Sequence, residues 1–322
     1  MKRAFILTAV AAILAAVSPG ALAQNLWPVK PIKLIAVFPP GGSVDQVARI
    51  LAAQLTKQLG QPVIVENRGG ASGSIGTQAV STAAPDGYTY GIVFDTHAVN
   101  PSLIPNLPFD TVKDLSPVML IGTSPMAIVA HPGQPYRDFR EVLAAAKKGP
   151  VSIGSVGTGS LGHLAMAQIG NLAKADFTHI PYRGGGPLMT DALGGQVPLA
   201  IGTVFLVNPH VKAGKLKALA VTSARPSPQM PGVVTVAEQG LPGFAALAWW
   251  GVVAPANMSP QYTQRMHEAL ATALKDPEVA EKLTAQGMDI IGGRPADLDA
   301  FVRMEIARWA RVVSDNKIKA GD

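Results

Sequence analysis

The sequence predicts an α/β protein with two lobes connected by two strands, and three observations support this prediction. At roughly 150 residues per domain, a chain of 322 residues corresponds to about two domains. Short β-rich runs alternate with helical stretches, which is typical of parallel α/β units. Two long apolar runs, residues 118–130 and 244–254, separate two sets of such units. We therefore expect two mostly parallel sheets flanked by helices and joined by these two runs.

The first 23 residues have the pattern of a secretory signal peptide. Lys2 and Arg3 precede an uncharged apolar run, and Ala21-Leu22-Ala23 supplies the small residues of a cleavage site. The apolar run is shorter than the ~20 residues that a membrane span requires. We expect Sec-type export and a soluble protein, with no lipid anchor because no cysteine follows the cleavage site.

The composition excludes several classes of protein. The chain has no cysteine, which excludes disulfide scaffolds, thiolate metal sites and cysteine nucleophiles. Lys and Arg number 27 against 21 Asp and Glu, but two of the basic residues lie in the predicted signal peptide. The others are dispersed and have no aromatic residues interleaved with them. A nucleic-acid groove needs clustered basic residues and stacking platforms, so we expect no nucleic-acid partner.

The first α/β set begins with a strand over residues 32–38 and a helix that ends at Gly60. Apolar residues recur every four positions along this helix, as expected for one buried face. Ser43 is predicted to cap the helix, with Gln46 completing a capping box. Two more strands are expected over residues 62–66 and 88–94. A Gly/Ser-rich stretch, residues 69–76, is expected to open the helix between them.

The second α/β set follows the first apolar run, and a mainly helical region follows the second run. The strands of the second set are expected over residues 151–156, 177–181, 198–204 and 216–221. Its first helix is expected over residues 164–172, after the turn GTGSLG. The C-terminal helices are predicted over residues 260–274, 277–286 and 295–313.

Two strand-to-helix turns have the features of an anion site. In FPPGGSVD, residues 38–45, the glycines leave backbone N–H groups open at a helix start, where the helix dipole attracts anions. GTGSLG, residues 157–162, repeats this arrangement with Ser160 as the predicted cap. An ordinary turn is the alternative interpretation. GTGSLG also fits the dinucleotide pattern, but the acidic residue expected about 20 positions later is missing, so we expect no cofactor.

Two further loops that follow strands carry polar candidates. HIPYRGGGPLMTDALGGQV, residues 179–197, places Pro187 at the expected first position of a helix. Arg183 either pairs with a carboxylate or stays solvated. Asp191 faces either the cleft or a neighbouring backbone. The polar residues of the other loop, DTHAVNP, are Thr96, His97 and Asn100.

The sequence lacks the usual patterns of catalytic and metal sites. G-x-S-x-G does not occur, and the six histidines are scattered without an H-x-x-x-H pair, so neither a nucleophile elbow nor a metal site is predicted. The enzyme alternative is an exported hydrolase that uses a serine among glycines, such as Ser160. Trp249 and Trp250 in the second apolar run are expected to pack in the core or hinge, with contact to the cleft as the alternative.

Together these motifs resemble the Bug family, the extracytoplasmic solute receptors of tripartite tricarboxylate transporters. The resemblance extends from residue 27 to about residue 309 and depends on the order and spacing of several stretches. They are WPVKPIKLIAVFPPGGSVDQVARILA, LGQPVIVENRGGASGSIGTQAV, APDGYTY, HIPYRGGGPLMTDALGGQV and LPGFAALAWWGVVAP, followed by the Pro-led C-terminal helices. Two departures leave the identity of the ligand open. Ser43 stands where glycine is common, and residues 184–186 carry more glycine than the family pattern.

The resemblance implies a Venus-flytrap fold of the type II periplasmic class and a carboxylate ligand held largely by backbone amides. Lobe 1 is expected to comprise residues 24–122 and 250–322, and lobe 2 residues 123–249. One loop from each lobe would grip a ligand carboxylate, and other residues would flank it. The implied site residues are Phe38, Pro40, Gly41, Gly42, Ser43 and Asp45; Gly157, Thr158, Gly159, Ser160 and His163; Thr96, His97 and Asn100; and Tyr182, Arg183, Gly184 and Asp191.

These expectations describe a periplasmic protein that captures a small carboxylate in the cleft between its lobes. Di- and tricarboxylates, amino acids and aromatic acids all occur as ligands in the family. The protein is expected to be a monomer that delivers its ligand to the membrane subunits of a tripartite tricarboxylate transporter. A sensor that presents the bound ligand to a membrane kinase is the alternative.

Overall fold

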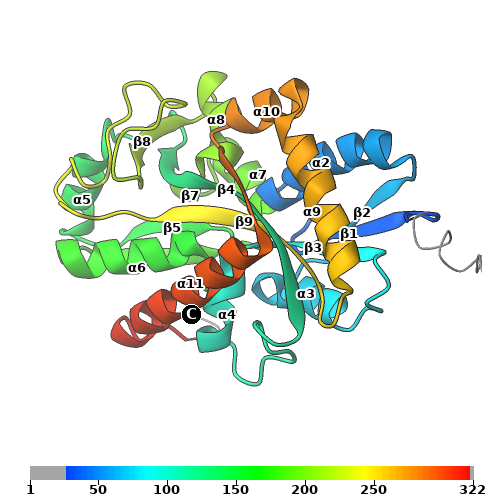
Figure 1. Cartoon of the computed structure of the whole chain (residues 1–322). Helices are drawn as coiled ribbons and strands as arrows, with labels where there is room; N and C mark the ends of the chain where they lie inside the picture. The colour runs from blue at the N-terminus through cyan, green and yellow to red at the C-terminus, as the bar shows by residue number, and fades with distance from the viewer. Residues whose placement is uncertain (1–26, 320–322) are drawn as a thin grey trace, which may run out of the picture.

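The computed structural model describes residues 27–319, so the predicted signal peptide lies outside the described residues. Two lobes are visible in Figure 1, and two long strands run side by side between them. These strands are β4 (Leu115–Ala130) and β9 (Leu247–Pro255), which correspond to the two apolar runs of the sequence. The predicted two-lobed α/β architecture is therefore present.

The first sheet combines strands from both ends of the described chain. Its order is β2-β1-β3-β9-β4, and β10 also pairs with β4. The bounds of the other four strands are β1 (Ile32–Ala36), β2 (Val63–Asn67), β3 (Thr89–Phe94) and β10 (Asp289–Gly293). Because β9 pairs antiparallel with β3, with Phe94 opposite Trp250, the first and last parts of the chain form one lobe.

The second sheet uses the C-terminal end of β4. Its order is β4-β7-β5-β6, and β8 also pairs with β4. The bounds are β5 (Val151–Ser155), β6 (Phe177–Pro181), β7 (Leu199–Thr203) and β8 (Lys217–Val221). Pairing of β4 with β9 ends at Pro125, and pairing with β7 begins at Met126. A single strand thus belongs to both sheets.

The sheets contain more antiparallel pairing than predicted. The pairs β1–β2, β1–β3, β5–β6 and β5–β7 are parallel, as expected for α/β units. Every pair that includes β4 or β9 is antiparallel. The pair β4–β9 is antiparallel because β4 leaves the first lobe and β9 returns to it, so the two crossing strands run in opposite directions.

Helices cover both sheets. The helices of the first lobe are α2 (Ser43–Leu59), α3 (Ser74–Ser81), α4 (Thr96–Leu103), α9 (Pro260–Lys275), α10 (Pro277–Thr284) and α11 (Pro295–Asp315), with the short 3-10 helix η3 (Ala71–Gly73) before α3. The second lobe carries α5 (Phe139–Ala146), α6 (Leu161–Ala173), α7 (Gly185–Leu193) and α8 (Val204–Lys212). Helices α2, α9 and α10 pack together, and α11 crosses α4 and β4 (Figure 1).

Helix α2 shows how the sequence pattern becomes local structure. Val47, Leu51 and Leu55 are fully buried, so the predicted four-residue repeat does face the sheet. Gly60 follows the helix in the left-handed conformation with φ +66°, and its N–H donates to the carbonyl oxygen of Thr56. Glycine adopts this conformation without a Cβ penalty, which explains why the helix ends there.

Three local predictions were wrong, and one strand was missed. Gly42, not Ser43, caps α2, and its cap has no side-chain hydrogen bond. Helix α7 begins at Gly185, so Pro187 is its third residue; proline fits there because amides of the first turn have no partner within the helix. The stretch after Asp95 is the helix α4 and not a loop. Strand β10 was not predicted, because it is short and contains two glycines.

The two crossing strands carry an aromatic cluster at the junction of the lobes. Trp250 is fully buried, and its ring centre lies 5.3 Å from that of Phe94 and 5.5 Å from that of Phe205. Phe94 ends β3 in the first lobe, whereas Phe205 lies at the start of α8 in the second. Trp249 is also fully buried and packs against Phe301 of α11. Core and hinge packing, as predicted, accounts for both tryptophans.

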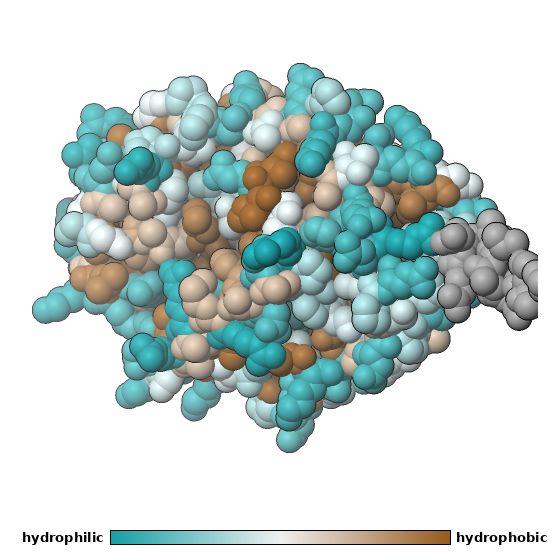
Figure 2. Space-filling model, in the orientation of Figure 1, coloured by the Kyte–Doolittle hydropathy of each residue, from teal (hydrophilic) through white to brown (hydrophobic). Residues whose placement is uncertain are grey.

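The face of the molecule drawn in Figure 2 is mainly polar. On the face drawn in Figure 2, hydrophobic side chains form small separate patches among polar ones. Among residues 27–319, no helix combines the length and the apolar character needed to cross a membrane.

Candidate ligand-binding site

Loops from both lobes meet where strands β1, β3, β5 and β6 end. A methyl group placed on Gly42 would lie 3.5 Å from the backbone nitrogen of Gly185, and one placed on Gly184 would lie 3.1 Å from Pro39. Ser72 Oγ donates a hydrogen bond of 2.5 Å to the carbonyl oxygen of Thr158. The lobes are therefore closed against each other along these loops. In open α/β sheets, ligands bind at the carboxyl ends of the strands.

The first loop presents the start of α2 to the other lobe. Gly41 has φ +81°, a conformation that favours glycine, and its N–H donates to Asp45 Oδ2 at 3.0 Å. Burial alone would raise the pKa of Asp45, but hydrogen bonds from Arg49, Gly41 and Asn67 outweigh it and lower the pKa. Asp45 is thus an ionised residue that holds the loop in shape. The predicted residues Phe38, Pro40, Gly42 and Ser43 lie in or directly beside this loop.

The second loop presents the start of α6. Ser160 is the N-cap residue, as predicted, and its Oγ accepts from the N–H of His163 at 3.4 Å. Gly159 has φ +74°, and its N–H donates to His163 Nδ1 at 3.1 Å. Gly157 has φ +139°. These bonds fix the loop from Gly157 to Ser160 in one conformation and leave Thr158 against the first lobe.

The serine and histidine residues behind this loop form a buried network. Ser160 Oγ donates to Ser155 Oγ at 3.2 Å, and Ser155 Oγ lies 2.7 Å from His179 Nε2. The rings of His163 and His179 stack with their centres 3.8 Å apart. Ser155 and Ser160 are at most 1% exposed, so both hydroxyl groups are engaged in holding the helix start.

The predicted residues of α4 are buried in the first lobe and have different environments. Asn100 is buried and donates from Nδ2 to the carbonyl oxygen of Ser72 at 3.0 Å, so it positions the serine that contacts Thr158. His97 packs edge-on against Trp249 with ring centres 6.4 Å apart. Burial lowers the pKa of His97 to about 4, which keeps its ring neutral. Thr96 is buried at the first position of the helix.

The loop after β6 carries the remaining predicted site residues, and Asp191 follows it in α7. Tyr182 donates from its hydroxyl to Asp191 Oδ2 at 2.8 Å. Asp191 therefore accepts from a side chain of the loop after β6, a partner that the sequence did not predict. Burial and the hydrogen bond to Asp191 raise the pKa of Tyr182 to about 12, so Tyr182 stays protonated. Gly184, with φ +114°, contacts Pro39 and Phe38 of the first lobe, whereas Arg183 is exposed.

Asp95 belongs to this site, although the sequence did not single it out. It follows β3 directly and is 1% exposed. Its Oδ1 accepts from the N–H of Leu161, the first residue of α6, at 3.4 Å. Burial is the main cause that raises the pKa of Asp95 to about 8. An acidic residue directly after an apolar strand is the signal in the sequence that could have identified it.

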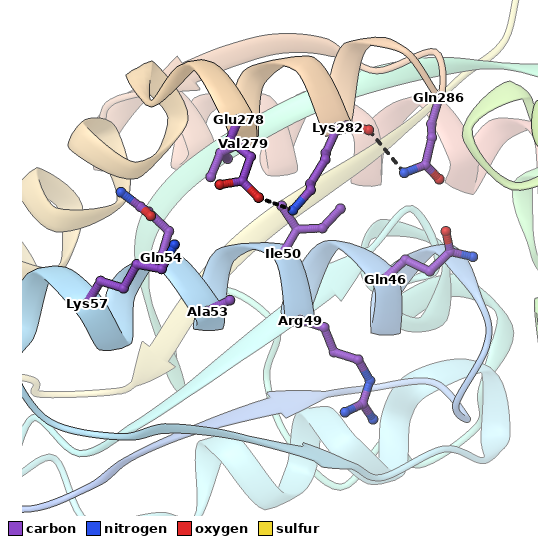
Figure 3. Close-up of a pocket in the computed structure, with 10 residues that line it drawn as sticks. All are labelled: Gln46, Arg49, Ile50, Ala53, Gln54, Lys57, Glu278, Val279, Lys282 and Gln286. Carbon is purple, nitrogen blue, oxygen red and sulfur yellow. Dashed lines mark hydrogen bonds and ion pairs between the residues drawn. The ribbon is translucent and has the colours of Figure 1, made fainter.

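One surface groove of the first lobe lies away from these loops. It has a volume of about 520 Å³ and runs between α2 and α10 on the first lobe. Figure 3 shows Ile50 pointing into this groove and Arg49 pointing away from it, while Glu278 pairs with Lys282 at 2.5 Å. None of the loop glycines lines the groove. Among residues 27–319, no cluster of His, Cys, Asp and Glu is suited to a metal ion.

Comparison with known proteins identifies the family. Residues 47–318 match the sequence profile described as the tripartite tricarboxylate transporter family receptor. The chain belongs to this receptor family. Protein BugT from Bordetella pertussis is 37% identical over 302 residues, which cover 92% of this chain and 93% of BugT. The resemblance to the Bug family is therefore confirmed.

Solved structures of this receptor family have the same fold. Periplasmic binding protein BugD is 31% identical with a TM-score of 0.87, and the match covers 91% of this chain and 99% of BugD. R. palustris Rpa4515 with adipate is 30% identical with a TM-score of 0.87 over 91% of this chain and 99% of that one. MatC from Rhodopseudomonas palustris with bound malate is 31% identical with a TM-score of 0.83. The match covers 89% of this chain and 100% of MatC. The periplasmic-binding-protein fold of this receptor is confirmed.

Proposed function

We propose that this receptor captures a small carboxylate in the cleft between its lobes and delivers it to the membrane subunits of a tripartite tricarboxylate transporter in the periplasm. The observation that carries the proposal is the position of two helix starts at the interface between the lobes. The start of α2 lies against Gly185 and Gly186 of α7, and Thr158, in the loop before α6, accepts from Ser72 of the first lobe. Helix starts offer unpaired N–H groups and the positive end of the helix dipole, both of which favour an anion.

The ligands of related structures support the same class of ligand. MatC was solved with malate and Rpa4515 with adipate, and both are dicarboxylates. The glycines of the loops allow backbone atoms to approach a ligand closely. The lobe boundaries at residues 122/123 and 249/250 remain a proposal. They lie close to the points where β4 changes partner and where β9 passes between the lobes.

A thermal-shift screen against mono-, di- and tricarboxylates, with malate and adipate among them, tests ligand capture. A ligand at 100 times its Kd stabilises the folded state by about 2.7 kcal/mol, which gives a clear rise in Tm. Matched amides and alcohols of the same carbon skeleton serve as controls and should leave Tm unchanged. If no carboxylate raises Tm, the proposed ligand class is wrong.

Delivery to a transporter is tested separately in the bacterium. Deletion of the gene should abolish uptake of the ligand that the screen identifies, and expression of the protein from a plasmid should restore it. Transcription of the genes whose expression responds to this ligand is measured in parallel. Normal uptake with a lost transcriptional response would contradict transport and favour the sensor.

A further inference from the structure

Asp95 is a buried acid at the interface of the two lobes, and only part of its hydrogen-bonding capacity is used. Its Oδ1 accepts from Leu161 N–H across the interface at 3.4 Å. Its Oδ2 is buried and has no hydrogen-bond partner among the described residues. A buried polar atom without a partner is costly in free energy, so this oxygen calls for a group that is supplied from outside the chain.

The surroundings of Asp95 favour its neutral form. Burial raises its pKa most, and the nearby Glu305 carboxyl group on α11 raises it further, to about 8. Glu305 is itself buried, accepts from Trp309 Nε1 at 2.7 Å and lies 3.5 Å from Arg308. His97 on α4 and His163 on α6 are the titratable residues of those two helices, and neither β9 nor η3 carries one. Helix α11 also carries Asp297, Asp299, Arg303, Arg311 and Asp315.

The proton of the neutral carboxyl group belongs on Oδ2, because Oδ1 already accepts a hydrogen bond from Leu161. Oδ2–H is then a buried donor without an acceptor, placed beside the start of α6. The same helix start is where the proposed function expects a ligand carboxylate. A carboxyl group donates a short, strong hydrogen bond to a carboxylate, because the acceptor is charged.

We propose that Asp95 is a ligand-binding residue whose protonated carboxyl group donates from Oδ2 to the carboxylate of the ligand, beside the N-terminus of α6. This inference rests on the proposed function. No covalent bond changes: the proton remains on Oδ2 at neutral pH. When Asp95 is ionised at alkaline pH, ligand binding takes up one proton from the solvent. The site therefore selects a hydrogen-bond acceptor such as a carboxylate over an ammonium group, which has no acceptor, at this position.

The test uses the full-length mature protein and isothermal titration with malate, adipate and the other carboxylates of the screen at pH 6, 7, 8 and 9. Because only the protonated form donates, wild-type affinity should fall about tenfold between pH 6 and pH 9 for a pKa near 8. Asp95→Asn keeps a donor of nearly the same shape. It should bind like the wild type at pH 6 and show no loss at pH 9.

Two further variants complete the test. Asp95→Ala removes the donor and should bind at least tenfold more weakly at every pH, with circular dichroism to verify folding. Glu305→Gln, a matched change of a buried acid on α11, should keep the alkaline loss of affinity but move it to lower pH, because Glu305 raises the pKa of Asp95. Heats measured at pH 8 in buffers of different ionisation enthalpy should reveal proton uptake in the wild type but not in Asp95→Asn.

The outcomes separate the two proposals. If carboxylates bind but the alkaline loss persists in Asp95→Asn, or Asp95→Ala binds as tightly as the wild type at pH 6, the role of Asp95 is overturned and the proposed function stands. If Asp95→Asn binds much more weakly than the wild type at pH 6, an ionised Asp95 accepting from the ligand replaces the donor. If no carboxylate binds the wild type, both proposals fall.

Discussion

Gly159 has almost no free space around it in the closed structure. A Cβ atom added there would lie 2.0 Å from Leu103 Cδ2 of the other lobe, and φ is +74°. Gly159→Ala should therefore hinder closure and weaken ligand binding by about tenfold or more, equivalent to about 1.4 kcal/mol. Isothermal titration with the ligand found by the thermal screen measures the effect.

Gly60→Ala is the matched control for this change. Gly60 also has a positive φ, of +66°, but no atom lies within 4 Å of an added Cβ. The control should lose about 1 kcal/mol of folding stability and keep full affinity. Equal affinities in the two variants would show that the contact between Gly159 and Leu103 has no part in binding.

His97 makes stability depend on pH. Its pKa is lowered by burial from an ordinary 6.5 to about 4. A lowered folded-state pKa means that the contribution to stability is complete above pH 6.5 and is lost as the pH falls through 4. The full loss corresponds to about 3 kcal/mol. In urea unfolding at pH 7.5 and 4.5, His97→Gln should show a smaller drop in the free energy of unfolding than the wild type. An identical drop would assign the acid sensitivity to other groups.

At the scale of residues, the sequence allowed the loops to be found but not the partners of their side chains. Glycines and helix caps are local signals, so the turns around Gly41 and Gly159 were visible in the sequence. The interaction of Asp95 joins residues 66 positions apart, and its burial depends on two lobes closing. Asp191 was recognised as a candidate, yet its bond to Tyr182 depends on where α7 begins.

At the scale of elements, the cap of α6 links folding to binding. Ser160→Ala removes the hydrogen bond to His163 N–H and the bond to Ser155, which should cost about 1 kcal/mol of stability. It should also weaken binding several-fold, because the loop before α6 loses its fixed conformation. Chemical denaturation measures the loss of folding stability, and isothermal titration of the same sample measures the loss of ligand affinity.

Asp138→Ala provides the control for an N-cap outside the site. Asp138 caps α5 and accepts from Glu141 N–H at 3.1 Å. The loss of stability should resemble that of Ser160→Ala, while affinity stays unchanged. A loss of affinity in both variants would mean that general stability, and not the α6 loop, controls binding.

Long amphipathic helices and buried strands were predicted well, because their periodicity is repeated over several turns or residues. The predicted and observed bounds of α9 differ by one residue, and those of β6 coincide. Short elements were missed. Strand β10 has two glycines, and it becomes a strand only because β4 supplies a partner, with Asp289 opposite Thr123. Such pairing over a long distance leaves no local pattern.

At the scale of the molecule, closure depends on few direct polar contacts between the lobes. Ser72→Ala removes the hydrogen bond to the Thr158 carbonyl oxygen, worth about 1 kcal/mol, so affinity should fall about fivefold. In small-angle scattering at subsaturating ligand, Ser72→Ala should have a larger mean radius of gyration than the wild type. Ser81→Ala, whose hydroxyl binds Gln78 within α3, should behave like the wild type. An unchanged affinity in Ser72→Ala would contradict this role.

The order of the strands in the first sheet also determines when this protein can fold. β9 lies between β3 and β4 in this sheet, and its Trp250 is opposite Phe94 of β3. Until the ribosome has delivered residue 255, β3 has an unpaired edge and the aromatic cluster lacks its middle ring. Contacts between residues so distant in sequence also slow folding. The first lobe, although it starts the chain, is thus completed last, and the nascent polypeptide stays unfinished until synthesis is nearly over.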